Sequence, residues 1–444
     1  MEDEKKLLSE IIAEFRKSGL TAGRATITIY DSRTASIKGN EKVQLSSDHR
    51  TSLTCDGFRD GKLISEVFDA EHDSPSDIAA KIAVDVKNGR PYSDTWFPKV
   101  NTRLGKSDSY AAKLDETKNE VLELLAEKAK EQIAEADRSI TDIDIALTYW
   151  KDQSFLKSFN PQLQPEEVAD LKARRNGLKL SVRFAIDYQG KKIEISGNQS
   201  AHKNFDNLEV PAFTSSLVRR AKLLVDAKPA PRYAGSIIVC PELAAILLKH
   251  ACSELDGSCY YAGDSIYEGK LGTDVFSPSL IVINDPFIAS DYARSFDSEG
   301  YPTEKFMAID HGKLRCLFLD NAFGEKLKSE TNGCADGDKR NCQYLVVTPS
   351  DRSLNEMISA EKNGVIVENV DFKSLVLKSL KDTEFSIQFY GWTIVDGKRD
   401  QPIKGRLTGN PQTAMSSIES MSRERGDFHG CLIPWMKIAD LKID

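Results

Sequence analysis

The feature that most constrains the fold is a short apolar run that leads directly into a helical pattern. Residues 236–240 read Ser-Ile-Ile-Val-Cys, a proline follows, and residues 242–255 place Leu, Ala and Ile at the spacing of one helix face. A strand, a tight connection and a helix are therefore expected here. The end of this helix carries Lys249, His250 and Glu254, whose chemistry bears on function.

The remaining patterns predict a mixed α+β fold. Helical spacing of apolar residues predicts helices over residues 1–18, 74–86, 110–137, 166–175, 213–227 and 353–361. Alternating or short apolar runs predict strands over residues 26–30, 35–38, 51–55, 62–68, 142–149, 178–188, 191–196, 279–283, 315–319, 344–347, 386–394 and 436–443. We expect an α+β domain with antiparallel sheet over residues 1–205 and a β-rich domain over residues 206–444.

The composition excludes several classes of function. A net charge of −8 argues against nonspecific nucleic-acid binding, which needs clustered Lys and Arg, and the basic residues 172–175 are interpreted as a solvated helix end. No apolar run reaches membrane-spanning length and the start lacks a signal-peptide pattern, so a cytoplasmic location without membrane or nucleic-acid partners is expected. The eight cysteines have irregular spacing and are expected to be reduced thiols.

Several blocks after residue 213 occur in an order that resembles the TldD/PmbA family, and its PmbA (TldE) branch more than its TldD branch. The first block reads Phe-Asp-Ser-Glu-Gly over residues 296–300 and continues through a hairpin over residues 309–314. Further blocks cover residues 347–367, 395–410 and 431–439. The resemblance implies an N-terminal α+β domain, a C-terminal β-rich domain, and dimers or TldD–TldE heterodimers that enclose a chamber.

In TldD, a helix in this setting carries His-Glu-x-x-x-His. Its two histidines and a distant cysteine bind zinc, and its glutamate is the base. The matching positions here are Lys249, His250 and Glu254. An ammonium repels a divalent cation, so the resemblance implies that the zinc site is lost. No cofactor or metal is expected in this chain, no catalytic residue is assigned, and zinc is expected in a TldD-like partner.

A rewired metal site is the alternative. His250 and Glu254 are four residues apart and share one helix face, and His429 or Cys431 falls near the family's third ligand. The same pattern is also typical of a surface His–Glu pair and a buried structural cysteine.

The lost zinc site and the rewired metal site together allow three functions. The first is a non-catalytic, PmbA/TldE-like subunit of a metallopeptidase complex, which binds unfolded peptides beside a TldD-like zinc peptidase subunit. The second is a stand-alone metal-dependent peptidase or hydrolase that uses the rewired site. The third is a homodimeric peptide-binding protein. Whether the chain is itself an enzyme stays open at this point.

Overall fold

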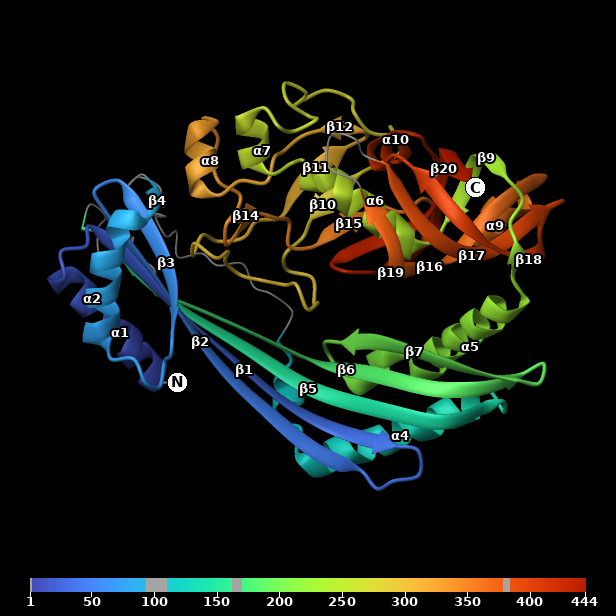
Figure 1. Cartoon of the computed structure of the whole chain (residues 1–444), viewed down its shortest axis with the longest axis horizontal. Coiled ribbons are helices and arrows are strands. Elements are labelled where there is room, and N and C mark those ends of the chain that lie inside the picture. Colours follow the sequence, from blue (N-terminus) through green and yellow to red (C-terminus); the bar gives the residue numbers. More distant parts are fainter. Residues whose placement is uncertain (1, 93–109, 162–169, 378–383) are drawn as a thin grey trace.

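A computed structural model describes residues 2–92, 110–161, 170–377 and 384–444 of the chain (Figure 1). Helices and sheets are mixed, which confirms the α+β prediction. The long strands of the N-terminal half form a curved sheet, and the strand-rich C-terminal half lies above it in the view of Figure 1. Among the described residues, no helix is both long and apolar enough to cross a membrane.

The N-terminal sheet is antiparallel throughout and has the strand order β4-β3-β2-β1-β5-β6-β7. Its strands are β1 (Ala22–Lys38), β2 (Gln44–Arg59), β3 (Lys62–Phe68), β4 (Arg90–Pro91), β5 (Ile140–Phe159), β6 (Asp170–Tyr188) and β7 (Lys191–Ala201). The helices are α1 (Glu2–Lys17), α2 (Pro75–Asp85), η1 (Val86–Asn88), α3 (Ala112–Asp115), α4 (Asn119–Ala136), η4 (Phe205–Leu208) and α5 (Val210–Asp226).

The period-two alternation of β1 gives this sheet two different faces. Ala25, Ile27 and Ile29 are buried under α1 and α2, and farther along the strand Ala35 and Ile37 are buried with α4. Because successive side chains of a strand point to opposite faces, the intervening polar residues of β1 lie on the face without helices. That polar face is turned toward the C-terminal half.

The C-terminal sheet is mixed and has the order β12-β11-β10-β15-β20-β9-β16-β17-β18-β8, with β19 paired to β20. Its strands are β8 (Lys228–Pro229), β9 (Tyr233–Val239), β10 (Val282–Asn284), β11 (Phe306–Asp310), β12 (Lys313–Leu314), β15 (Leu345–Val347), β16 (Asn363–Leu377), β17 (Phe385–Val395), β18 (Lys398–Gly409), β19 (Ile418–Asp427) and β20 (Cys431–Ile443). The hairpin β13 (Ala335–Asp336) and β14 (Lys339–Arg340) stands apart. The helices are α6 (Pro241–Ser253), α7 (Gly257–Ala262), α8 (Asn321–Lys326), α9 (Leu354–Ser359) and α10 (Pro411–Ser416).

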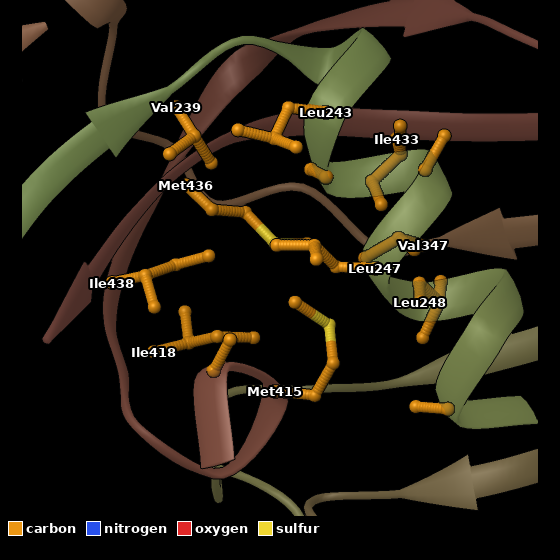
Figure 2. Close-up of a cluster of buried hydrophobic side chains, with 14 of the residues drawn as sticks. Val239, Leu243, Leu247, Leu248, Val347, Met415, Ile418, Ile433, Met436 and Ile438 are labelled. Carbon is orange, nitrogen blue, oxygen red and sulfur yellow. The ribbon is translucent and has the colours of Figure 1, made fainter. Parts of the chain in front are cut away.

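Helix α6 is the centre of the C-terminal core. Its first residue is a proline, whose fixed φ suits the first helical position. Figure 2 shows Leu243 and Leu247 of α6 beside Ile433 and Met436 of β20, and all four side chains are buried. Because removal of a buried leucine side chain typically costs about 2–5 kcal/mol, this packing fixes the orientation of the helix. The predicted strand and helix over residues 236–255 are thus confirmed.

Most other predicted elements are present, with longer bounds for several strands. The hairpin of β6 and β7 turns at Gln189 and Gly190, as predicted. Helix α9 has the predicted capping box, in which Ser353 accepts from the backbone N–H of Glu356 and the Glu356 carboxylate accepts from the backbone N–H of Ser353. The helix predicted over residues 110–137 is present as α3 and α4. All eight cysteines lie in the described residues and have free thiols.

Two predictions are wrong. Residues 170–175 belong to β6 rather than to a helix, because Leu171 pairs with Leu156 of β5 and this ladder overrides the helix propensity of the segment. Residues 166–169 of that predicted helix lie outside the described residues. The basic residues 172–175 therefore lie on a strand and do not end a helix. Residues 315–319 do not form the predicted strand, since the backbone N–H of Phe318 donates to the carbonyl of Leu255.

The division at residue 205 stays a prediction. Helix α5, placed with the second half by that division, packs Val210, Leu217 and Ala221 into the cluster that covers the N-terminal sheet. The chain then passes through β8 into β9.

Candidate functional site

The first candidate site lies at the C-terminal end of α6, where the zinc motif of TldD was expected. Lys249 is half-buried, and its Nζ donates a hydrogen bond of 2.5 Å to the carbonyl oxygen of His429. The same Nζ lies 5.6 Å from the centroid of the Tyr292 ring. Lys249, which the resemblance matches to the first zinc ligand, therefore contacts the segment that precedes β20 through its ammonium group.

His250 and Glu254 have different surroundings. His250 is half-buried, and burial lowers the pKa of its imidazole. Glu254 is buried, and its Oε2 accepts from the backbone N–H of Ile266 at 3.3 Å. Burial raises the pKa of the Glu254 carboxyl, whose Oε1 has no hydrogen-bond partner among the described residues. The hydroxyl of buried Tyr267 likewise has none there.

His429 and Cys431 complete the set of predicted site residues. His429 is exposed in a left-handed backbone conformation (φ +52°), and its ring stands edge-on to Phe372 with 5.6 Å between the centroids. Cys431 is the first residue of β20 and is buried, which raises the pKa of its thiol. A thiol that resists ionisation is a poor metal ligand, because metals bind the thiolate.

These residues do not fit a zinc centre. Zinc in proteins is held by at least three lone-pair donors in tetrahedral geometry. In the part of the chain that the structure describes, no group of three or more His, Cys, Asp or Glu is arranged to hold a metal. The structure therefore does not bring together the four candidate ligands His250, Glu254, His429 and Cys431. The ammonium of Lys249 offers N–H donors and no lone pair to a metal. That the protein binds no metal in solution stays a prediction.

A second candidate site is a cavity between the polar face of the N-terminal sheet and the loop that carries residues 293–299. Its volume is about 580 Å³, within the range typical of ligand pockets. It is lined by Arg24, Thr26, Thr28, Thr54, Asp56, Leu63, Ser65, Arg90, Asp152, Ser154, Leu156, Ala173, Arg174, Arg175, Ala293, Arg294, Ser295, Phe296, Asp297, Ser298, Glu299, Gly337 and Asp338.

An ion pair forms the buried floor of this cavity. Arg24 of β1 stands opposite Asp56 of β2, and its Nε and Nη2 lie 2.6 and 2.5 Å from the same carboxylate oxygen, Oδ2. Both side chains are buried. The third nitrogen of the guanidinium, Nη1, has no hydrogen-bond partner among the described residues. Buried polar groups are nearly always paired, so this nitrogen calls for an explanation.

Two buried carboxyl groups face this ion pair from the C-terminal half. Asp297 accepts from the backbone N–H groups of Glu299, Tyr301 and Ala335. Glu299 accepts from the hydroxyl of Tyr92 at 3.2 Å. Burial raises the pKa of Asp297 to about 6 and that of Glu299 to about 8. Both carboxyl groups therefore take up a proton more readily than a carboxyl group in water does.

The sequence interpretation missed this cavity. Asp297 and Glu299 are in the block that carried the family resemblance, but the prediction gave them no role. The sequence shows that polar residues alternate with apolar ones along β1. It does not show that these polar residues lie under the C-terminal half. Strongly shifted carboxyl groups in a cavity are typical of functional sites, so this cavity is a candidate site in its own right.

One loop joins the two candidate sites. The Asp291 carbonyl accepts a hydrogen bond from Arg175 of β6, and the Asp291 carboxylate lies 3.5 Å from Nε2 of His202. The next residue, Tyr292, is the ring beside Lys249. Arg294 then lines the cavity. The ring beside Lys249 and the lining of the cavity are thus only two positions apart in the sequence.

Known proteins are similar to this chain in sequence and in fold. The model of the PmbA/TldA metallopeptidase C-terminal domain matches residues 233–444. A protein of Methanothermobacter thermautotrophicus named a metalloprotease is 27% identical over 217 residues, which are 46% of this chain and 46% of that protein's own length. The metalloprotease TldD homologue of Haemophilus influenzae is 21% identical over 365 residues, covering 78% of this chain and 73% of that protein.

Solved structures show the same fold over the whole chain. TldE of Thermococcus kodakarensis superposes with a TM-score of 0.81 at 16% identity, covering 98% of this chain and 99% of that one. A Bacteroides thetaiotaomicron protein, named as a candidate modulator of DNA gyrase, superposes with a TM-score of 0.83 at 18% identity, covering 100% and 99%. Residues 233–444 thus belong to the PmbA/TldA metallopeptidase C-terminal domain family, and the whole chain has the fold of TldE.

Proposed function

We propose that this chain is a PmbA/TldE-like, non-catalytic subunit that binds unfolded peptides and pairs with a zinc-bearing, TldD-like peptidase subunit. One observation carries the proposal. The position of the first zinc ligand is a lysine whose ammonium donates to the His429 carbonyl and lies beside the Tyr292 ring. An ammonium in this place opposes a divalent cation by charge and offers it no lone pair.

Two further features support peptide binding by this subunit. The cavity beneath the C-terminal half has hydroxyl and charged groups on its walls, which suit the polar backbone of an unfolded chain. The sheets also end in edge strands such as β7, and extended peptides can add to an edge by main-chain hydrogen bonds that tolerate many sequences. The zinc and the general base of the complex are assigned to the partner.

The test is peptide hydrolysis by the purified chain, alone and with a TldD-like chain of the same organism that carries His-Glu-x-x-x-His. We expect no chelator-sensitive hydrolysis by this chain alone and faster hydrolysis by the pair than by the partner alone. Elemental analysis of the purified chain is expected to give well under one zinc per chain. Chelator-sensitive activity of the isolated chain, lost in His250→Ala, would overturn the proposal in favour of a rewired site.

A further inference from the structure

We propose that the cavity binds an internal, uncharged polar segment of an unfolded chain, which lies on the face of the N-terminal sheet and bonds to side-chain hydroxyl groups there. The inference rests on the proposed peptide-binding function and adds the class of segment and the groups that recognise it. It concerns a site separate from the end of α6 and from the edge strands of the sheets.

The cavity is open to solvent in two places. Beside Arg24, the lining includes the ion pair of Arg90 and Asp338, whose side chains are 48% and 91% exposed. Farther along the sheet, the side chains of Asp152 and Arg175 are 15% and 24% exposed. A bound chain can therefore continue into solvent in both directions, and the cavity does not require a chain terminus.

The floor of the cavity is long enough for a segment of about six residues. Arg24 of β1 pairs with Ser158 of β5, and the lining reaches Asp152, six residues earlier along β5. At about 3.3 Å per residue, this distance is roughly 20 Å. Strand β1 is paired on both sides, with β2 and with β5, so its backbone N–H and C=O groups are used within the sheet. A ligand on this face therefore bonds to side chains.

Most charged groups of the lining are already paired. Five arginines and five carboxyl groups line the cavity, so their numbers balance. The ion pairs are Arg24–Asp56, Arg175–Asp152, Arg90–Asp338 and, with a partner outside the lining, Arg294–Asp336. The guanidinium of Arg174 stacks on Tyr110, 3.7 Å from the ring centroid. The nitrogen of Arg24 that has no partner among the described residues, Nη1, is itself buried.

The two remaining carboxyl groups accept hydrogen bonds from the chain itself. Asp297 accepts from three backbone N–H groups. One oxygen of Glu299 accepts from the Tyr92 hydroxyl, and the other accepts from the backbone N–H of Asn321 at 3.4 Å. A ligand with a full charge thus finds few groups of opposite charge to pair with. Because removing an unpaired charge from water is costly, charged side chains are disfavoured in this cavity.

Apolar side chains gain little from this cavity. Leu156 and Phe296 of the lining are buried in one cluster with Leu171, and Leu63 and Ala293 are buried as well. Hydrophobic stabilisation scales with the apolar area that is removed from water. Since these apolar atoms are already removed from water within the chain, they offer a ligand little further stabilisation.

Hydroxyl groups are what the lining leaves for a ligand. The side-chain hydroxyls of Thr26, Thr54, Ser65 and Ser295 have no hydrogen-bond partner among the described residues, and none of these residues is buried. Thr26 and Thr54 stand directly opposite each other on β1 and β2. A hydroxyl both donates and accepts, so it can bond to a peptide N–H, a peptide C=O or a polar uncharged side chain.

The experiment is calorimetric titration of the full chain with hexapeptides whose two ends are blocked by acetyl and amide groups. The probe alternates Ala and Thr, and three matched peptides replace Thr by Val, Glu or Lys. We expect the Thr peptide to bind about tenfold or more tightly than each of the others, which is about 1.4 kcal/mol. A blocked dodecapeptide of alternating Ala and Thr is expected to bind at least as tightly as the hexapeptide, because both flanks can lie in solvent.

The decisive variant is the double substitution Thr26→Val and Thr54→Val, which keeps the shape and β-branching of both side chains. We expect it to bind the Thr hexapeptide about tenfold more weakly. Thr51→Val, on the opposite face of β2 and outside the lining, is the matched control and is expected to keep the affinity. Ser65→Ala changes an exposed position, so it keeps the fold, and is expected to weaken binding about threefold.

Four results would each overturn the inference. They are binding of the Val, Glu or Lys peptide as tightly as the Thr peptide, weaker binding of the dodecapeptide than of the hexapeptide, unchanged affinity in the double variant and in Ser65→Ala, and absence of binding by every peptide. Stimulation of the TldD-like subunit is measured separately, so a failure confined to the recognition of polar segments leaves the proposed function standing.

Discussion

Lys249 at the end of α6 and Arg24 in the cavity are both cationic side chains, and their surroundings differ. Lys249 is half-buried, so any N–H group not bonded to the His429 carbonyl can reach water. Arg24 is buried, and one of its nitrogens has no partner in the described residues. Lys249 thus has a hydrogen-bond partner within the chain, whereas Arg24 keeps one donor without a partner among the described residues.

The largest expected effect tests the difference in burial. Arg24→Met removes one partner of a buried ion pair and leaves Asp56 unpaired, which is expected to lower the free energy of unfolding by about 3–5 kcal/mol. Lys249→Met removes one hydrogen bond at a half-buried site and is expected to cost about 1 kcal/mol. Urea denaturation followed by circular dichroism measures both. Equal losses in the two variants would contradict the comparison.

A second prediction tests the apolar packing that orients α6. Leu247 is buried in the core that orients α6, so Leu247→Ala is expected to cost about 2–5 kcal/mol. The matched control is Leu124→Ala on α4, where 64% of the side chain is exposed and a loss of less than about 0.5 kcal/mol is expected. A small loss in Leu247→Ala would show that α6 is not held by this core.

The cavity also predicts a dependence of stability on pH. Burial raises the pKa of Glu299 from 4.5 to about 8, and that of Asp297 from 3.8 to about 6. The folded state therefore binds these protons more tightly than the unfolded state, and their contribution to stability is complete only below the unfolded pKa values. It is lost as the pH rises through about 6 and then about 8.

We expect the stability of the natural protein to fall by at least about 1.4 kcal/mol between pH 5 and pH 9, the equivalent of one pKa unit. Glu299→Gln cannot ionise and is expected to flatten this slope. Thermal unfolding at a series of pH values checks it. An equal slope in both proteins would mean that Glu299 is already ionised in the folded state.

The smallest expected effect probes the contact between Tyr292 and the segment before β20. Gly430 has φ +76°, and a Cβ there would lie 3.1 Å from the Tyr292 ring. Gly337 at the cavity has φ +61° and open space around it. Both alanine variants carry backbone strain of about 1–2 kcal/mol, and Gly430→Ala is expected to lose about 1 kcal/mol more. Identical losses would show that Tyr292 moves aside freely.

Local rules explain which elements could be predicted. The turn at Gln189 and Gly190 and the capping box of Ser353 and Glu356 depend on residues a few positions apart, and both are present. The helix predicted over residues 166–175 depended on propensity alone. Its described part is a strand, because Leu171 meets Leu156, fifteen positions earlier in the sequence, through the ladder with β5.

The sequence by itself determined the α+β class, the resemblance of the C-terminal half to the TldD/PmbA family, and the lysine at position 249, since these follow from residue identity and order along the chain. Only the tertiary structure decided where the Lys249 ammonium is bonded and that Arg24, Asp56 and Glu299 share one buried site. Those three residues come from two strands and a distant loop. Their charges matter because burial weakens the screening of charge by water, and burial is a property of the packed fold.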